Sequence, residues 1–205
     1  MWVDATVYCT RPLDDWIGDY LATGFLAFKD PGPDRRVSSW FLVAEQGHEL
    51  VCEWRRRFAG HFERHRFRLQ PTALGRFVVR QLTPVLGQNT RRTGLWLLPW
   101  VQRLLQVYPY FLLHYTFNEI VRPGTRLAEL WEATPTFRAV IPHRILHLAR
   151  RPDGLGPALV HIRSGVAPMY KLSWRVDTER GYWSAVLHAL QTIDMPPTPS
   201  PRTDS

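Results

Sequence analysis

The sequence predicts a mixed α/β domain, and three observations support this prediction. Strand-like runs of apolar and β-branched residues occupy 1–10 and 24–29. Apolar residues recur with helical spacing in 48–66 and in 99–121. The chain has 205 residues, of which 45% are hydrophobic, enough for one domain with a sizeable core.

In the first half of the chain, the strand-like run "GFLAFK" is followed by a Pro- and Gly-rich loop over 30–36. Ser38 or Ser39 then has the chemistry to cap a short helix that ends at Gly47. A longer helix is predicted over 48–66, with the apolar stripe Val51, Trp54, Phe58 and Phe62. We expect one more short helix around 73–81.

In the second half, the helical pattern of 99–121 ends at "RPGT", where Thr125 can cap a short helix that runs through Trp131. We expect a short strand over 159–163, a strand or loop in "MYKLSWRV", and a last helix from Asp177 or Thr178 to Gln191. Residues 193–205 have the Pro- and Ser-rich composition of a disordered tail.

Asp4 is unusual because it is a carboxylate within a strand-like run, where Asp is normally depleted. A strand that ends at a ligand site tolerates such a residue. Thr6 is two residues further on, and on a strand it would point to the same side as Asp4. We therefore take Asp4 as a candidate site residue, with Thr6 beside it.

The net charge of +8 is carried almost wholly by arginine, with Lys29 and Lys171 as the two lysines. Arginine favours bidentate contacts with phosphate and carboxylate, so the balance indicates an anionic partner: a nucleotide diphosphate, a lipid surface or a nucleic acid. A general compositional bias toward arginine explains the charge equally well. Cys9 and Cys52 are far apart in the sequence, which is typical of reduced thiols in the cytoplasm. No secretory signal precedes Asp4.

Three further patterns have both a functional and a structural interpretation, and we favour the structural one in each. "RRRFAGHFERHRFR" (55–68) mixes arginine with aromatic residues, as nucleic-acid surfaces do, but its Phe spacing fits a core helix with a solvated basic face. Residues 95–117 are too interrupted to span a bilayer, although they could lie on its surface; a core helix is favoured. The pairs His61/His65 and His143/His147 have zinc-ligand spacing, but no other metal motif accompanies them.

Four blocks together resemble the bacterial capsular polysaccharide synthesis family, which is related to glycosyltransferases with a DXD-type sugar-binding region. The blocks, in the family's order, are "WVDATVYCTRPL", "GFLAFKD" followed by "VSSWFLVAEQGHELVCEW", "YPYFLLHYTFNEIV" and "PMYKLSWR". The resemblance covers about residues 1–190. It implies a GT-A-like α/β nucleotide-sugar transferase fold over residues 1–192, incomplete because the family's usual amino-terminal βαβ units are missing.

The resemblance implies a glycosyltransferase that moves a sugar from a nucleotide-sugar donor to a capsular or exopolysaccharide acceptor, which can be a lipid-linked glycan. Asp4 would contact the donor ribose or a divalent cation, Mn²⁺ or Mg²⁺, and Thr6 stands where the fuller motif has its second Asp. Ser173 and Trp174 would close over the diphosphate, and Lys171 would neutralise phosphate charge. Four acidic residues remain open as the general base: Asp14, Asp15, Asp19 and Glu45.

The resemblance further implies that the strand carrying Asp4 is an inner strand, and that the isolated chain is poorly soluble or self-associates because its neighbours are missing. The expected location is cytoplasmic, in possible peripheral contact with the inner membrane face, with no nucleic-acid partner. Two alternatives stay open: a non-catalytic basic module that binds anionic glycan, lipid head groups or nucleic acid, and a catalytically inactive remnant. Binding of a nucleotide sugar with the participation of Asp4 separates the transferase from both.

Overall fold

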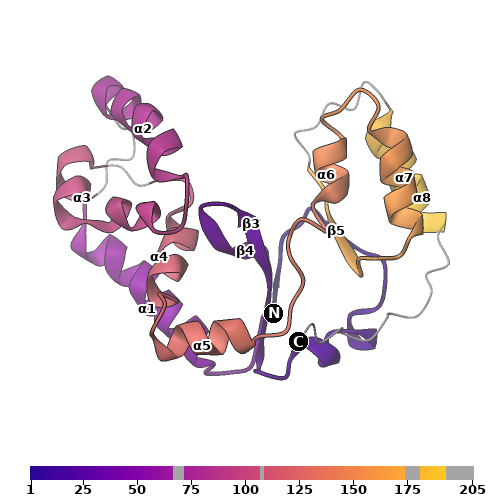
Figure 1. Cartoon of the computed structure of the whole chain (residues 1–205), viewed down its shortest axis with the longest axis horizontal. Helices are drawn as coiled ribbons and strands as arrows, with labels where there is room; N and C mark the ends of the chain where they lie inside the picture. Colours follow the sequence, from indigo (N-terminus) through magenta and orange to yellow (C-terminus); the bar gives the residue numbers. More distant parts are fainter. Residues whose placement is uncertain (67–71, 107–108, 174–180, 193–205) are drawn as a thin grey trace.

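A computed structural model describes residues 1–66, 72–106, 109–173 and 181–192, which form two lobes (Figure 1). The strands are β1 (Trp2–Val3), β2 (Val7–Cys9), β3 (Phe25–Gly32), β4 (Arg35–Ala44) and β5 (Met169–Lys171). The α-helices are α1 (Glu49–Arg64), α2 (Ala73–Leu86), α3 (Pro99–Leu105), α4 (Leu112–Ile120), α5 (Arg126–Ala133), α6 (Arg144–Leu148), α7 (Leu155–Arg163) and α8 (Tyr182–Thr192). Short 3₁₀ helices are η1 (Leu13–Asp15), η2 (Gly18–Tyr20) and η3 (Arg92–Leu97).

Two small sheets hold the strands. The first has the order β1-β4-β3, and the second pairs β2 with β5. The named strand pairs in the described residues are all antiparallel. The structure thus confirms the mixed α/β class, while these small antiparallel sheets do not confirm the finer GT-A-like prediction.

The β3–β4 hairpin is covered on both faces. Consecutive side chains of a strand point to opposite faces of the sheet, and residues 25–28 of β3 are all apolar. Phe25 and Ala27 pack with residues of α1, α4 and α5, including Leu50 and Trp131. Their neighbours Leu26 and Phe28 point to the other side, where they pack with Trp16, Tyr20, Trp40 and Met169. The hairpin therefore lies between helices α1, α4 and α5 on one face and a second cluster, which includes Met169 of β5, on the other.

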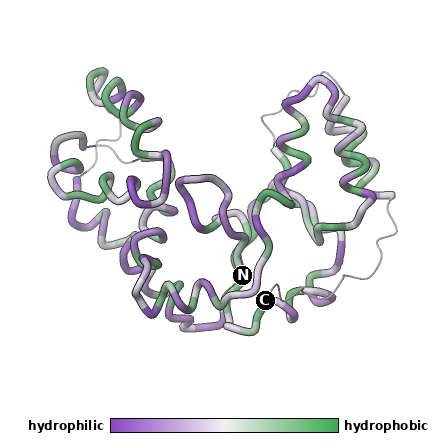
Figure 2. The backbone as a smooth tube through the Cα atoms, viewed as in Figure 1, coloured by the Kyte–Doolittle hydropathy of each residue, from purple (hydrophilic) through white to green (hydrophobic). Residues whose placement is uncertain are grey.

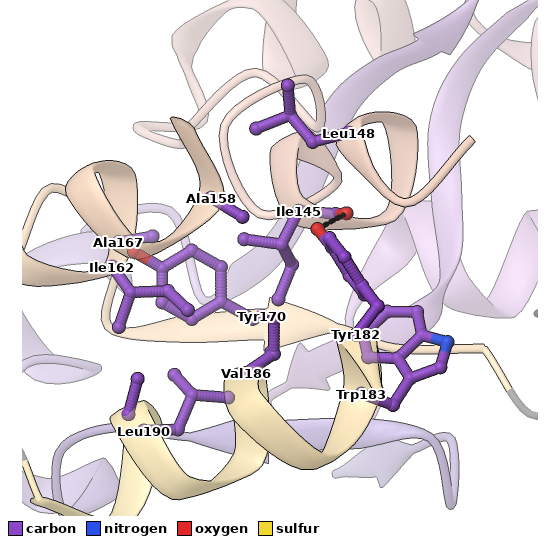
Figure 3. Close-up of a cluster of buried hydrophobic side chains, with 11 residues drawn as sticks. Ile145, Leu148, Ala158, Ile162, Ala167, Tyr170, Tyr182, Trp183, Val186 and Leu190 are labelled. Carbon is purple, nitrogen blue, oxygen red and sulfur yellow. Dashed lines mark hydrogen bonds between the residues drawn. The ribbon is translucent and has the colours of Figure 1, made fainter. Parts of the chain in front are cut away.

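The smaller lobe consists of α6, α7 and α8 packed around β5. Figure 2 shows hydrophobic stretches in the helices of both lobes. In the smaller lobe, Ile145, Ile162, Tyr170 and Val186 are fully buried in one cluster. Figure 3 shows the Tyr182 hydroxyl of α8 directed at the backbone of α6, where it donates to the Ile145 carbonyl at 2.6 Å. This bond ties α8 to α6 across the cluster.

Several predicted elements are confirmed. Helix α1 agrees closely with the predicted 48–66, α2 contains the predicted 73–81, and β3 begins one residue after the start of the strand predicted at 24–29 and includes the rest of it. The Thr125 cap is also confirmed, since its hydroxyl accepts the Ala128 N–H at 3.1 Å at the start of α5. The last helix is present as α8, but its predicted start lies outside the described residues, as does the predicted tail.

Other predictions are wrong. The helix expected after Ser38 is strand β4, because this segment pairs with β1 on one side and β3 on the other. The strand expected at 159–163 is part of α7, whose Ala158 and Ile162 face the core with helical spacing. The single helix predicted over 99–121 is two helices, with Gln106 in the left-handed region (φ 49°) at the end of α3. The prediction of an inner strand at the start of the chain is also wrong, because β1 is an edge strand of its sheet in the described residues.

We predict that Thr125→Ala lowers the free energy of unfolding by about 1 kcal/mol, because the first turn of α5 loses its cap. Thr125→Ser keeps the hydroxyl and should retain most of that stability. Urea denaturation followed by circular dichroism compares the two variants. Equal losses in both would show that the hydrogen bond to Ala128 does not stabilise α5.

Candidate functional site

The prediction that Asp4 lies on a strand over 1–10 is wrong: this segment forms two short strands, β1 and β2, and Asp4 lies in the turn between them. Its backbone N–H donates to the Trp40 carbonyl of β4 at 2.8 Å, and its own carbonyl accepts from the Val7 N–H at 3.1 Å. The Asp4 Oδ1 accepts from both the N–H and the hydroxyl of Thr6, each at 3.3 Å. A short carboxylate that bonds the backbone two residues ahead is typical of an Asx turn, which explains why Asp is suited to this position.

Lys171 joins Asp4 and Thr6 from the far end of the sequence. Its Nζ donates to Asp4 Oδ2 at 2.9 Å and also to the Thr6 hydroxyl. The pairing of β2 with β5 sets Val7 opposite Lys171, and the Leu172 N–H donates to the Thr6 carbonyl at 2.8 Å. Three of the five residues predicted for the site therefore form one cluster, although Asp4 and Lys171 are 167 positions apart.

Ser173 directly follows Leu172, so the backbone of the "YKLSW" block runs beside the Asp4 turn. The Ser173 side chain is half-buried. Trp174 lies outside the described residues. The closing role predicted for these two residues stays a prediction.

Electrostatics keep Asp4 ionised. The hydrogen bond from Lys171 lowers the pKa of the Asp4 carboxyl below its ordinary value of 3.8, with help from the Thr6 N–H and against a smaller opposing effect of burial. The Asp4 side chain is 42% exposed and that of Lys171 is 14% exposed. The cluster is thus a partly buried ion pair with its carboxylate open to solvent.

This donor set does not fit a divalent cation as it stands. Both carboxylate oxygens of Asp4 already accept hydrogen bonds, and the Lys171 ammonium occupies the position opposite Oδ2. Mg²⁺ and Mn²⁺ need several oxygen ligands, and an adjacent ammonium repels them. No group of three His, Cys, Asp or Glu side chains in the described residues has the arrangement of a metal site. The predicted Mn²⁺ or Mg²⁺ at Asp4 stays a prediction.

A cavity of about 400 Å³ lies between the tip of the β3–β4 hairpin and the segment that leads into α6. Its lining residues are Asp30, Pro31, Gly32, Pro33, Arg35, Thr90, Arg138, Val140, His143 and His147. The His143 ring lies 5.5 Å from that of Trp40, whose carbonyl holds Asp4. The backbone N–H of Lys171 donates to the backbone carbonyl of Pro142, the residue before His143. His143 therefore connects the cavity with the Asp4–Lys171 pair.

Burial, together with the positive charges of His147, Lys171 and Arg35, lowers the pKa of His143 to about 4. His143 is consequently neutral near pH 7. It can exchange hydrogen bonds with a ligand but adds no charge to the cavity, so the cations there are the arginines.

Arg35 is held in place by the contacts of its neighbour Asp34 with α4. The Asp34 carboxylate accepts from the Tyr115 hydroxyl and from Arg35 Nε, both at 2.9 Å. The Arg35 guanidinium also lies over the Phe111 ring, 3.8 Å from its centroid. On the other wall, Arg138 Nε is 3.9 Å from Asp30 Oδ2, and both of these side chains are more than half exposed. Arg138 is therefore free to turn toward a ligand, while Arg35 is fixed.

Sequence reasoning missed this cavity, because hairpin pairing and the route into α6 bring its walls together. The one available signal was the His143/His147 pair, whose rings lie 5.9 Å apart at the start of α6. The ring centroids of the other pair, His61 and His65, lie 4.9 Å apart, and both residues line a separate cavity of about 260 Å³. The four acidic residues left open as the base do not line the cavity beside Asp4: Asp14, Asp15, Asp19 and Glu45.

Comparison with known families gives one match. Residues 1–70 match the family model described as capsular polysaccharide synthesis protein. This segment runs from β1 through α1, so it contains Asp4, Thr6 and Arg35 but not Lys171 or His143. The match supports a role in capsular polysaccharide synthesis. No curated protein and no solved structure matches the chain. In the described part of the chain, no helix is long and apolar enough to cross a membrane.

We predict that Asp4→Asn, which keeps the turn geometry and removes the charge, lowers the free energy of unfolding at pH 7 by up to about 1 kcal/mol. Folding lowers the pKa of Asp4, so its stabilising effect is complete above the ordinary value of 3.8 and is lost as the pH falls through the lowered pKa. Urea denaturation of both proteins across that range measures the difference. In a Lys171→Met background the difference should disappear; a difference of the same size there would contradict the ion pair.

Proposed function

We propose that this chain acts in capsular polysaccharide synthesis as a glycosyltransferase whose donor diphosphate lies between Arg35, Arg138 and Lys171. The observation that carries the proposal is the Lys171 ammonium, bonded to Asp4 and Thr6 beside a cavity with two arginines. The family match over residues 1–70 supports the class of reaction.

The chemistry explains why cations are needed at this place. In sugar transfer the bond between the sugar anomeric carbon and the donor phosphate oxygen breaks, and a bond forms from that carbon to an acceptor hydroxyl oxygen. The nucleoside diphosphate leaves with the bonding electrons and gains negative charge, while the acceptor hydroxyl loses its proton. Fixed positive groups aimed at the leaving oxygen stabilise that charge without reorganising. The planar guanidinium of Arg35 suits phosphate oxygens, and its contact with Phe111 holds it in place.

Asp4 has two roles in this proposal. Its Oδ2 holds the Lys171 ammonium in place, and the carboxylate is exposed enough to accept a hydrogen bond from a hydroxyl of the donor ribose. The neutral His143 offers a hydrogen bond to the donor between Lys171 and Arg35. Ser173 and Trp174 would cover the diphosphate, and the acceptor would be a polysaccharide or lipid-linked glycan.

The test is hydrolysis of a panel of UDP- and GDP-sugars by the purified chain. We predict that Asp4→Asn, which removes a charged hydrogen bond, slows donor hydrolysis about ten- to a hundredfold. Arg35→Gln combined with Arg138→Gln should raise KM for the donor. The matched control combines Arg150→Gln with Arg163→Gln, two exposed arginines outside the cavity, and should match the parent.

The same assay tests whether a divalent metal ion contributes to donor hydrolysis. Thr6→Asp adds a second carboxylate beside Asp4, so its activity should fall on addition of a chelator more than that of the parent. If the parent hydrolyses a donor and Asp4→Asn is equally fast, Asp4 is only a turn-forming residue. If no donor in the panel is bound or hydrolysed by the parent, the transferase proposal is contradicted.

A further inference from the structure

The positive charge of the chain is concentrated in one stretch. Residues 64–118 contain eight arginines and no Asp or Glu, whereas the net charge of the whole chain is +8. Outside this stretch, acidic and basic residues therefore balance. Its described part forms α2, η3, α3 and most of α4, the outer part of the larger lobe (Figure 1). Four of the eight arginines lie on these elements, namely Arg76 and Arg80 on α2, Arg92 on η3 and Arg103 on α3.

Helix α2 has apolar residues on two of its sides. One side faces the protein, where Val79, Leu82 and Leu86 pack against a cluster that contains Trp96 and Tyr115. The other side carries Leu74, Phe77 and Val85, which share a stripe at 3.6 residues per turn. Leu74 is 71% exposed and Phe77 is 60% exposed. Since a helix that only covers a core needs one apolar side, the second side requires a different explanation.

Basic and aromatic residues accompany this second side. Arg80 is exposed on α2 next to the stripe in the helical projection. In the neighbouring outer elements, Trp100 is 64% exposed at the start of α3 and Tyr110 precedes α4 with its ring in water. Figure 2 shows hydrophobic segments on α2, at the outer end of this lobe. Exposed aliphatic and aromatic groups flanked by arginine are typical of helices that lie in a membrane interface.

The absence of acidic residues in 64–118 decides which partner fits. A second copy of this face would place arginine against arginine, which is unfavourable. An anionic lipid surface supplies the missing negative charge and also accepts the apolar side chains. We propose that the Leu74–Phe77–Val85 side of α2, with Trp100 and the adjacent arginines, docks on the surface of a bilayer that contains anionic lipid. This inference does not depend on the sugar-transfer activity.

The experiment is co-sedimentation of the whole chain with vesicles of phosphatidylcholine alone or with one quarter phosphatidylglycerol. We expect binding to the anionic vesicles that weakens steeply with added salt. Leu74→Ser combined with Phe77→Ser should lower the partition coefficient at least about tenfold, because two large apolar groups no longer enter the interface. Arg80→Gln should lower it about fivefold.

The matched control combines Val160→Ser with Leu187→Ser, two exposed apolar residues on α7 and α8 of the smaller lobe. It makes the same kind of change at two exposed apolar side chains of the other lobe, and it should bind like the parent. Failure of the parent to bind anionic vesicles would overturn the proposal, as would equal losses in the control. Sedimentation velocity without vesicles adds an independent check. Self-association that Leu74→Ser with Phe77→Ser abolishes would assign the face to a second copy and would also overturn it.

Discussion

The antiparallel pairing of β2 with β5 is the constraint on which the candidate site depends. Three residues near the start of the chain pair with three near position 170, and this pairing places Lys171 opposite Val7. Further contacts hold the same junction together, since Thr10 bonds Ala167 and the buried Arg11 bonds the Gly165 carbonyl at 3.3 Å. This junction is what brings Lys171 within hydrogen-bond distance of Asp4. The short turn between β1 and β2 then positions the Asp4 carboxylate to accept a hydrogen bond from the Lys171 ammonium.

A second anchor positions the arginine side of the cavity. The tip of the β3–β4 hairpin is tied to α4 through Asp34, whose carbonyl accepts from the Asn118 amide at 2.7 Å and whose carboxylate accepts from Tyr115. Asn118 also accepts the Arg36 N–H at 3.1 Å. Burial, reinforced by the bond to Asp34, raises the pKa of the Tyr115 hydroxyl, so it donates this bond at any physiological pH. The two anchors together hold Lys171 and Arg35 in place, while the exposed Arg138 remains adjustable.

Local patterns predicted those elements that local interactions stabilise. The stripe of α1 and the hydroxyl of Thr125 are sufficient in themselves to specify a helix and a cap. The segment after Ser38 was predicted as a helix because its residues tolerate either state, and only pairing with β1 and β3 decides for a strand. The helix predicted over 99–121 is interrupted near Pro109, a residue that removes a backbone donor. The family resemblance alone predicted that Asp4 and Lys171 belong to one site; their direct ion pair was not predicted, and no local pattern indicated Arg35 and Arg138.

The central claim is that segments distant in sequence form one anion-binding site, and hydrogen–deuterium exchange with pyrophosphate tests it most directly. Pyrophosphate is the group that all nucleotide diphosphate sugars share. The account predicts that it slows exchange in 4–9, 138–147 and 169–172 with one common concentration dependence, and that Arg35→Gln with Arg138→Gln weakens all three effects together. Protection limited to one of these segments, or no protection at millimolar pyrophosphate, would contradict the account.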